Sequence, residues 1–78
     1  MKKLPIISGK EAIKIFEKFG YRVIRQRGSH VRLVHKSDKT KKPLTIPLHP
    51  VIGRGLLRKL MRDANISREE FLEMYRKL

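Results

Sequence analysis

The sequence contains no cysteine and only three histidines. The absence of cysteine excludes a disulfide framework and a zinc site built on thiolates, and it is consistent with a reducing compartment, so we expect a cytoplasmic protein. His30, His35 and His49 are enough in number for an open zinc site. The strand pattern described below turns His35 to one face of a sheet and the other two to the opposite face. We therefore expect neither a metal nor another cofactor.

Acidic residues are scarce, because 20 lysines and arginines stand against seven aspartates and glutamates and leave a net charge of +13. This excess is larger than solubility requires in a small domain, so a polyanion such as RNA is the favoured partner. A charged surface of a heat-stable protein is the alternative. The absent cysteine and the single asparagine and glutamine would suit that alternative as well.

Long hydrophobic runs are also missing. The amino end begins like a signal peptide, but its apolar run is short and is interrupted by Pro5, and no segment approaches the length of a membrane span. We expect no membrane association. A chain of 78 residues is expected to form one small domain over residues 1–78.

Apolar residues at helical spacing predict a helix from about Gly9 to Phe19. Ser8 and Glu11 form a capping box at its start, and Gly20 supplies the left-handed residue that ends it.

Two more helices are expected in the second half of the chain. The first begins at Gly53 or Gly55 and ends at Ala64, before a left-handed Asn65. The second follows a capping box of Ser67 and Glu70, where Ile66 is placed to staple onto Phe71, and runs to the end of the chain. Its apolar stripe is assigned to the core or to a partner surface: Phe71, Met74, Tyr75 and Leu78.

Three strands are predicted between the helices, over Tyr21–Arg27, His30–Lys36 and Pro43–Pro47. In the second strand, alternation turns His30 and Arg32 outward and Val31, Leu33 and His35 inward. The third strand is bounded by prolines and is therefore expected to be short and at the edge of the sheet.

Gly28-Ser29 suits a two-residue hairpin loop, because a type II′ turn requires a positive φ at its first position. Counting back from this turn, Arg27 opposes His30, Arg25 opposes Arg32, and Val23 opposes Val34. One face of the hairpin is then cationic and carries an imidazole. The other face is formed by Gln26, Ile24, Val31 and Leu33.

The element order α-β-β-β-α-α predicts an α+β fold of two layers, in which helices cover one face of a three-stranded antiparallel sheet and the other face is open. This layout matches the double-stranded-RNA-binding domain, which recognises A-form RNA through its shape, phosphates and 2′-hydroxyls.

Five short segments occur in order along the chain: Phe19-Gly20-Tyr21, Gln26-Arg27-Gly28-Ser29-His30, Ile46-Pro47-Leu48-His49, Gly55-Leu56-Leu57-Arg58 and Ala64-Asn65-Ile66-Ser67. In this order, and in a chain this short and basic, they resemble the HicA family of toxins over nearly the whole length. The resemblance implies a double-stranded-RNA-binding-like fold, ribosome-independent cleavage of mRNA, and an antitoxin of the HicB type that blocks the toxin.

Carried over by motif, the catalytic histidine of the family falls on His30. The sequence departs from many relatives in having Leu56 rather than threonine after Gly55, and a shorter loop between His49 and Gly55. These departures concern RNA contacts at the start of the second helix and the cleavage preference. Without the resemblance, His30 would be read as an exposed strand residue beside a turn.

RNA supplies its own nucleophile, so an enzyme can cleave it by removing the 2′-OH proton, stabilising the phosphorane and protonating the departing 5′-oxygen. Histidine suits proton transfer near neutral pH, and the planar guanidinium of arginine binds phosphate oxygens in pairs. We therefore expect His30 to be the general base. The general acid is left open between His49 and Tyr21. The expected substrate-binding residues are Arg25, Arg27, Ser29, Arg32 and His49.

Two other functions are compatible with the sequence: a non-catalytic module that binds double-stranded RNA, and a basic structural protein of a ribonucleoprotein. The lysine-rich segment 39–42 is expected to attract backbone phosphates non-specifically in any of these cases. The sequence leaves the oligomeric state and the cleavage sequence open.

Overall fold

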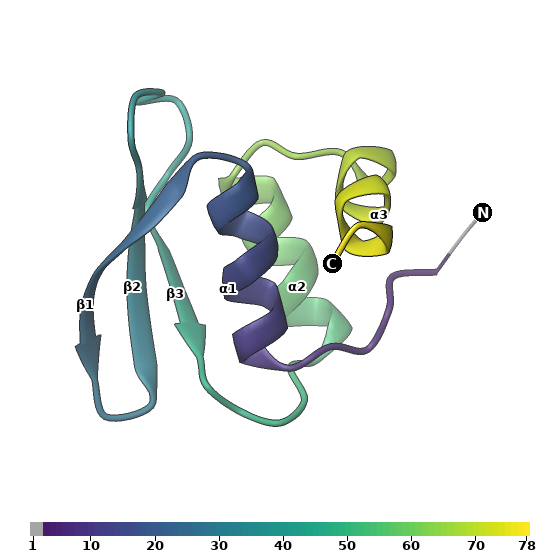
Figure 1. The fold of residues 1–78 in the computed structure, drawn as a ribbon, viewed down its shortest axis with the longest axis horizontal. Helices are drawn as coiled ribbons and strands as arrows, with labels where there is room; N and C mark the ends of the chain where they lie inside the picture. Colours follow the sequence, from purple (N-terminus) through teal and green to yellow (C-terminus); the bar gives the residue numbers. More distant parts are fainter. Residues whose placement is uncertain (1–2) are drawn as a thin grey trace.

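Six elements follow one another in the order α-β-β-β-α-α in the computed structural model, which describes residues 3–78. Figure 1 shows them as α1 (Gly9–Lys18), β1 (Tyr21–Arg27), β2 (His30–His35), β3 (Leu44–Pro47), α2 (Arg54–Asp63) and α3 (Arg68–Arg76). All six predicted elements are present, and their ends agree with the prediction to within two residues.

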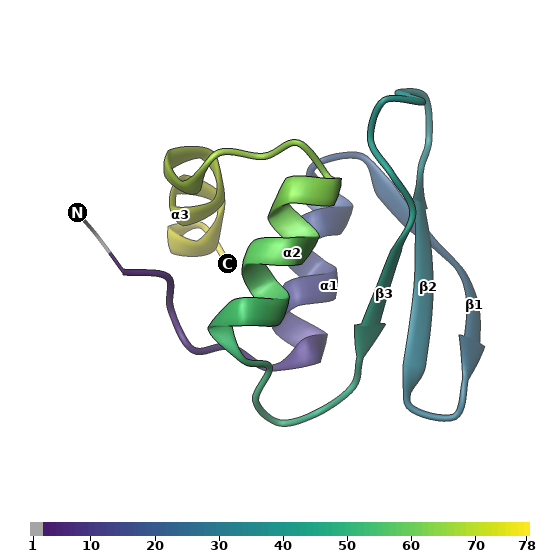
Figure 2. The ribbon, with the colours of Figure 1, turned by 180° about the vertical axis from the view of Figure 1, so that it is seen from behind.

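The three strands form one antiparallel sheet in the order β1-β2-β3, which confirms the edge position of β3. Helices α1 and α2 lie side by side against one face of this sheet, and α3 lies beyond them, on the side away from the strands (Figures 1 and 2). The other face of the sheet is left uncovered. The predicted α+β class and its open sheet face are thereby confirmed.

Local capping fixes the start of two helices. Ser8 accepts a hydrogen bond from the Glu11 backbone N–H at 3.0 Å, and the Glu11 carboxylate accepts one from the Ser8 N–H at 2.9 Å. Ser67 and Glu70 repeat this reciprocal arrangement at α3. Such a cap contributes about 1 kcal/mol to stability. Helix α2 differs, because its N-cap residue Gly53 makes no side-chain capping bond.

The chain reverses direction where residues of positive φ were predicted. Gly20 follows α1 with a φ of 101°, and Asn65 follows α2 with a φ of 55°. Both residues therefore act as the left-handed stops expected after a helix.

The core lies between the sheet and the helices and is entirely apolar among the described residues. Phe16 of α1 is at its centre, with its ring centroid 6.1 Å from that of Tyr21 and 6.0 Å from that of Phe71. Of the apolar stripe predicted for the last helix, Phe71 is buried in the core, whereas Leu78 lies beyond the end of α3 and is 48% exposed. Across residues 3–78, every helix is too short or too polar to cross a membrane.

The register of the β1–β2 hairpin departs from the prediction at one point. Arg27 opposes His30 and Arg25 opposes Arg32, as expected, but Val23 opposes Leu33 rather than Val34. The cause is a β-bulge between Val23 and Arg25, in which Ile24 is the extra residue.

The bulge exchanges the two faces of the first part of β1. Side chains alternate along a strand, so one inserted residue moves all residues beyond it to the opposite face. Uninterrupted alternation would place Tyr21 on the same face of the sheet as His30. Tyr21 lies in the core instead and is 1% exposed. Arg22 moves the other way and joins the open face, opposite Val34.

Candidate active site

The open face of the sheet presents two rows of polar side chains. One row joins Arg27 of β1 to His30 of β2, and the next joins Arg25 to Arg32. Their neighbours Val31 and Leu33 are buried, so alternation directs these four side chains away from the helices. With Arg22, which the bulge adds, they form what we call the arginine face: Arg22, Arg25, Arg27, Arg32 and His30.

Among the described residues, no ion pair joins an arginine of this face to a carboxylate. Residues 18–37 contain six lysines and arginines and no aspartate or glutamate. Most of the carboxylates are also occupied elsewhere. Glu11 and Glu70 cap helices, Asp38 accepts hydrogen bonds from Thr40, and Asp63 pairs with Lys59 at 2.9 Å. The positive potential of the arginine face is therefore available to a bound anion.

Two hydrogen bonds fix the turn that precedes His30. Gly28 has a φ of 58° and Ser29 has no positive φ, as the predicted type II′ turn requires. The Gln26 side-chain amide donates to the Gly28 carbonyl at 3.0 Å, and the Ser29 carbonyl accepts from the Leu48 N–H at 2.7 Å. The two residues that precede His30 are thus fixed by hydrogen bonds.

His30 itself is exposed, at the first position of β2. Its Cα partners are Arg27 on one side and Pro47 on the other. Within residues 3–78 its imidazole makes no hydrogen bond to the protein, so both ring nitrogens are accessible to a ligand. This placement agrees with the predicted outward orientation.

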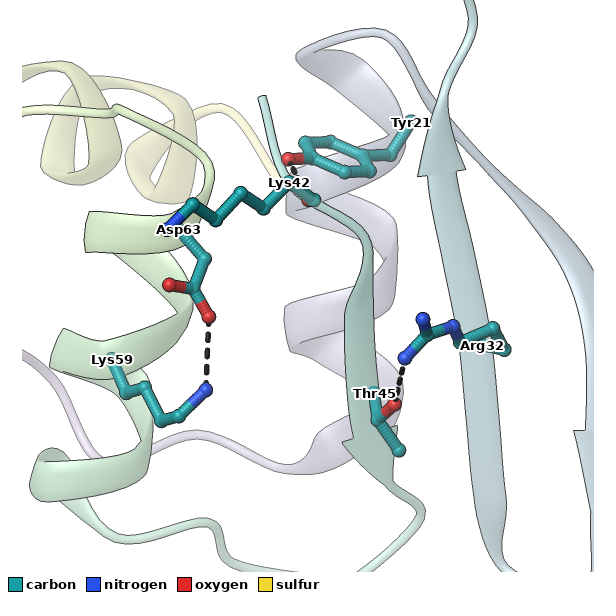
Figure 3. A network of polar contacts seen from close by, with 6 residues as sticks. All are labelled: Tyr21, Arg32, Lys42, Thr45, Lys59 and Asp63. Atoms are coloured by element: carbon teal, nitrogen blue, oxygen red, sulfur yellow. Dashed lines mark hydrogen bonds and ion pairs between the residues drawn. The ribbon is translucent and has the colours of Figure 1, made fainter. Parts of the chain in front are cut away.

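Arg32 is oriented by a residue of the neighbouring strand. Its Nη1 donates to Thr45 Oγ1 at 2.9 Å, across the β2–β3 pairing that joins the two residues (Figure 3). This bond uses one of the five N–H donors of the guanidinium and leaves the others for an anion. Thr45 therefore limits the rotamers of a side chain that would otherwise be free in solvent.

His49 lies two residues beyond the end of β3 and is exposed. Its carbonyl accepts the N–H of Gly9 at 2.9 Å. Gly9 has no room for a side chain, because a Cβ there would overlap the Pro47 carbonyl oxygen. The start of α1 thus fixes the backbone of residues 47–49, which is bonded in turn to the turn beside His30.

The structure rules out Tyr21 as a proton donor for this face. Its hydroxyl donates to the Lys42 carbonyl at 2.7 Å, and it pairs with His35, at the far end of the hairpin from His30. Burial, reinforced by the negative charges of Asp63 and Asp38, raises the pKa of Tyr21 to about 12. Tyr21 is a structural residue, and His49 is the one remaining acid among those predicted.

His35 faces inward, as predicted, and its hydrogen bonds define its tautomer. Nδ1 accepts the backbone N–H groups of Ser37 at 3.2 Å and Asp38 at 2.9 Å, so it carries no proton. Nε2 lies 2.8 Å from the Phe19 carbonyl, to which it must donate. This ring ties the β2–β3 loop to the end of α1 and lies on the other side of the sheet from His30.

The lysine-rich segment does not act as one solvated cluster. Lys41 Nζ donates to the carbonyl of Ala64, the C-cap of α2, at 2.8 Å. The segment lies at the opposite end of the sheet from the Gly28-Ser29 turn (Figure 1). Lys41 therefore stabilises the carboxyl end of α2, and the expected attraction of phosphates to residues 39–42 stays a prediction.

Among residues 3–78, histidine and acidic side chains form no group of three that could hold a metal ion.

Comparison with known protein families identifies the chain. A model of the HicA toxin of bacterial toxin-antitoxin systems matches residues 9–66. The chain belongs to the HicA toxin family. No curated protein and no solved structure matches it.

The region matched to the HicA family includes α1, the whole sheet and α2, and it ends before α3. The arginine face, the Gly28-Ser29 turn and His49 therefore all lie within the part of the chain that defines it as a HicA toxin. The resemblance found in the five short segments is confirmed.

Three contributors to the site were missed by sequence reasoning: Arg22, Thr45 and Gly9. Arg22 depends on the bulge, for which the sequence of β1 gives no marker. The contact of Thr45 with Arg32 depends on the β2–β3 register, which pairs the two residues. Gly9 looked like an ordinary first residue of a helix, and only its contact with Pro47 shows why a glycine stands there.

Proposed function

We propose that this HicA toxin is a ribosome-independent endoribonuclease that cleaves mRNA, with His30 as the general base and the arginine face as the phosphate-binding surface. The observation that supports it most directly is the placement of His30. It is an exposed imidazole without a protein hydrogen bond, beside a fixed turn, on a face with four arginines and no carboxylate.

The chemistry follows from these groups. Neutral His30 takes the proton of a ribose 2′-OH, and the resulting oxyanion attacks the adjacent phosphorus. Arg27 is opposite His30 and Arg32 follows it by two residues, so their guanidinium groups can bind the phosphate oxygens as negative charge develops in the transition state. Because the nucleophile belongs to the RNA, this route needs no metal ion. It leaves a 2′,3′-cyclic phosphate and a 5′-hydroxyl end.

The departing 5′-oxygen must receive a proton from a second group, since the imidazole that accepts a proton cannot donate one in the same concerted step. We assign this role to His49. Its exposed position, and the Leu48–Ser29 hydrogen bond that connects its segment to the turn, support the assignment. Arg25 and Ser29 complete the substrate-binding set, Arg25 through its charge and Ser29 through its position in the turn.

We also propose that a HicB-like antitoxin controls this activity. An open cationic face on a toxin must be covered when the toxin is inactive, and an acidic protein has the charge to cover it.

Purified protein incubated with end-labelled mRNA in the presence of EDTA tests the proposal. We expect cleavage products with 5′-hydroxyl ends from the wild type. His30→Ala should lower the rate by at least about 10²-fold, and His49→Ala by about 10²-fold or less if water can replace it. RNA binding, measured by fluorescence anisotropy, should change little in either variant.

Val23→Ala provides a matched control, because it changes an exposed, uncharged residue of the same hairpin that has no part in the proposed site. Full cleavage activity in His30→Ala would refute the assignment of the base. Tight RNA binding without cleavage in the wild type would instead favour a module that only binds double-stranded RNA, which the layout of the fold also permits.

A further inference from the structure

Two aliphatic side chains outside the arginine face are more exposed than any other large hydrophobic residue in the described chain. Ile6 is 59% exposed and Val51 is 58% exposed. Ile6 precedes α1, and Val51 lies in the loop between β3 and α2. The proposed cleavage reaction uses neither residue.

These two side chains lie on one surface. Ile7 and Ile52 form an antiparallel bridge, with the Ile52 N–H donating to the Ile7 carbonyl at 2.9 Å, and both side chains are buried. Ile6 and Val51 each adjoin a bridge residue, so alternation directs both outward. They are diagonal neighbours across the bridge, a relation that places side chains about 7–8 Å apart. We call this surface the Ile6–Val51 patch.

The patch lies close to His30. The Leu48 N–H bonds to the Ser29 carbonyl, next to His30, and Val51 is three residues further along the chain. Three extended residues reach at most about 10 Å. Figures 1 and 2 show the β1–β2 turn and the β3–α2 loop at the same end of the molecule. A protein bound to the patch would therefore extend to the active site.

The surroundings of the patch are cationic. Arg54 Nε donates to the Leu4 carbonyl at 2.8 Å, which fixes its guanidinium beside the segment that carries Ile6. Lys10 is exposed in the first turn of α1. Residues 3–10 and 39–62, which build both sides of the patch, contain no aspartate or glutamate.

The side-chain types distinguish between possible occupants. Single-stranded RNA binds by stacking its bases on aromatic rings, which isoleucine and valine lack, whereas aliphatic side chains gain free energy when an apolar side chain of another protein covers them. A second copy of this chain would bring another net charge of +13 against the same surface. An acidic protein with an apolar contact residue is complementary both to the apolar patch and to its cationic surroundings.

We propose that the Ile6–Val51 patch is the apolar anchor of the antitoxin, so that the antitoxin binds beside the arginine face and reaches over His30. This inference rests on the proposed antitoxin partner. It separates two functions on the surface of the toxin: the arginine face binds RNA, and the patch binds the inhibitor.

The test uses the purified full chain and the purified product of the open reading frame adjacent to its gene. In Ile6→Ser/Val51→Ser, we expect the dissociation constant for that protein to rise by about 10- to 100-fold, as for loss of a central apolar contact. Cleavage of RNA in the absence of the inhibitor should stay within about twofold of the wild type. Leu78→Ser is the matched control, because it removes a similarly exposed aliphatic side chain at the other end of the chain.

Equal affinity of the double variant and the wild type would overturn the inference while leaving the antitoxin proposal intact. Failure of the wild type to bind the neighbouring protein would count against the partner itself. Reduced RNA affinity in the double variant would show an RNA contact instead, and a wild-type dimer that the variant abolishes, seen by analytical ultracentrifugation, would show a self-association surface. If the double variant unfolds at a lower temperature than the wild type, Val51→Lys replaces it, because Val51 is exposed. The dissociation constant of Val51→Lys for the neighbouring protein is then compared with that of the wild type.

Discussion

The hydroxyl of Tyr21 provides a sharp test of the fold, because replacing it should change how stability depends on pH. Tyr21 is 1% exposed and donates a 2.7 Å hydrogen bond to the Lys42 carbonyl. Tyr21→Phe removes this bond. Because Lys42 is exposed, water can reach the freed carbonyl, and we expect a loss of about 1 kcal/mol in the free energy of unfolding at pH 7.

The same burial makes the wild type sensitive to alkali. The pKa of Tyr21 is raised from 10.0 to about 12 in the folded protein. Below pH 10 both states hold the phenolic proton. Between pH 10 and 12 the unfolded chain releases it while the folded chain retains it, so rising pH favours unfolding. A shift of two pKa units corresponds to a loss of up to about 2.7 kcal/mol before solvent screening is taken into account, of which about half is reached near pH 11.

The two stability curves should therefore cross near pH 11. The wild type is the more stable protein at pH 7, and Tyr21→Phe is the more stable one above the crossing point. Urea unfolding of both proteins between pH 7 and pH 11.5 measures the difference, in which ionisation of lysines common to both cancels. Tyr75→Phe, which leaves Tyr21 intact, should keep the alkaline loss of the parent. A difference that stays constant over the whole range would refute the burial of the Tyr21 hydroxyl.

Three further outcomes are expected. Gly9→Ala should lower the free energy of unfolding by about 2–3 kcal/mol, because the added methyl group meets the Pro47 carbonyl. Gly55→Ala, which adds a methyl group in open space within a helix, should raise the free energy of unfolding by about 0.5–1 kcal/mol. Equal effects of the two substitutions in urea melts would contradict the close approach at Gly9. Thr45→Val should raise the KM for RNA by about two- to fivefold with a smaller change in kcat, because it removes the hydrogen bond that orients Arg32. Thr45→Ser keeps a hydroxyl for this bond and should restore the KM of the wild type. An unchanged KM in Thr45→Val would show that Arg32 does not need the bond to Thr45. If the arginines of the sheet contact four phosphates of single-stranded RNA, affinity should fall about 50-fold between 50 and 200 mM salt, and a flat salt dependence in a titration would exclude this contact.

Much of the fold was predictable because local signals were strong. The capping boxes at Ser8 and Ser67, the left-handed Gly20 and Asn65 and the Gly28-Ser29 turn each act within a few residues. Such features specify where elements begin and end without reference to the rest of the chain.

The candidate site was predictable in part. The outward orientation of His30 and its pairing with Arg27 follow from the turn alone, because a two-residue loop fixes the register next to it. The role of Tyr21 was wrong, since one inserted residue at Ile24 reverses the face of everything before it in β1. The contact of Lys41 could not be predicted, because its partner, the carbonyl of Ala64, is 23 residues away in the sequence.

The sequence by itself determined the order and limits of the helices and strands, the cationic character of the hairpin and the position of His30 at its turn, because these depend on interactions between near neighbours. Only the tertiary structure decided which side chains join His30 on the open face and which enter the core. The bulge in β1, the contact of Gly9 with Pro47 and the bond between Arg32 and Thr45 all arise where distant segments meet, and no local pattern encodes the distances between them.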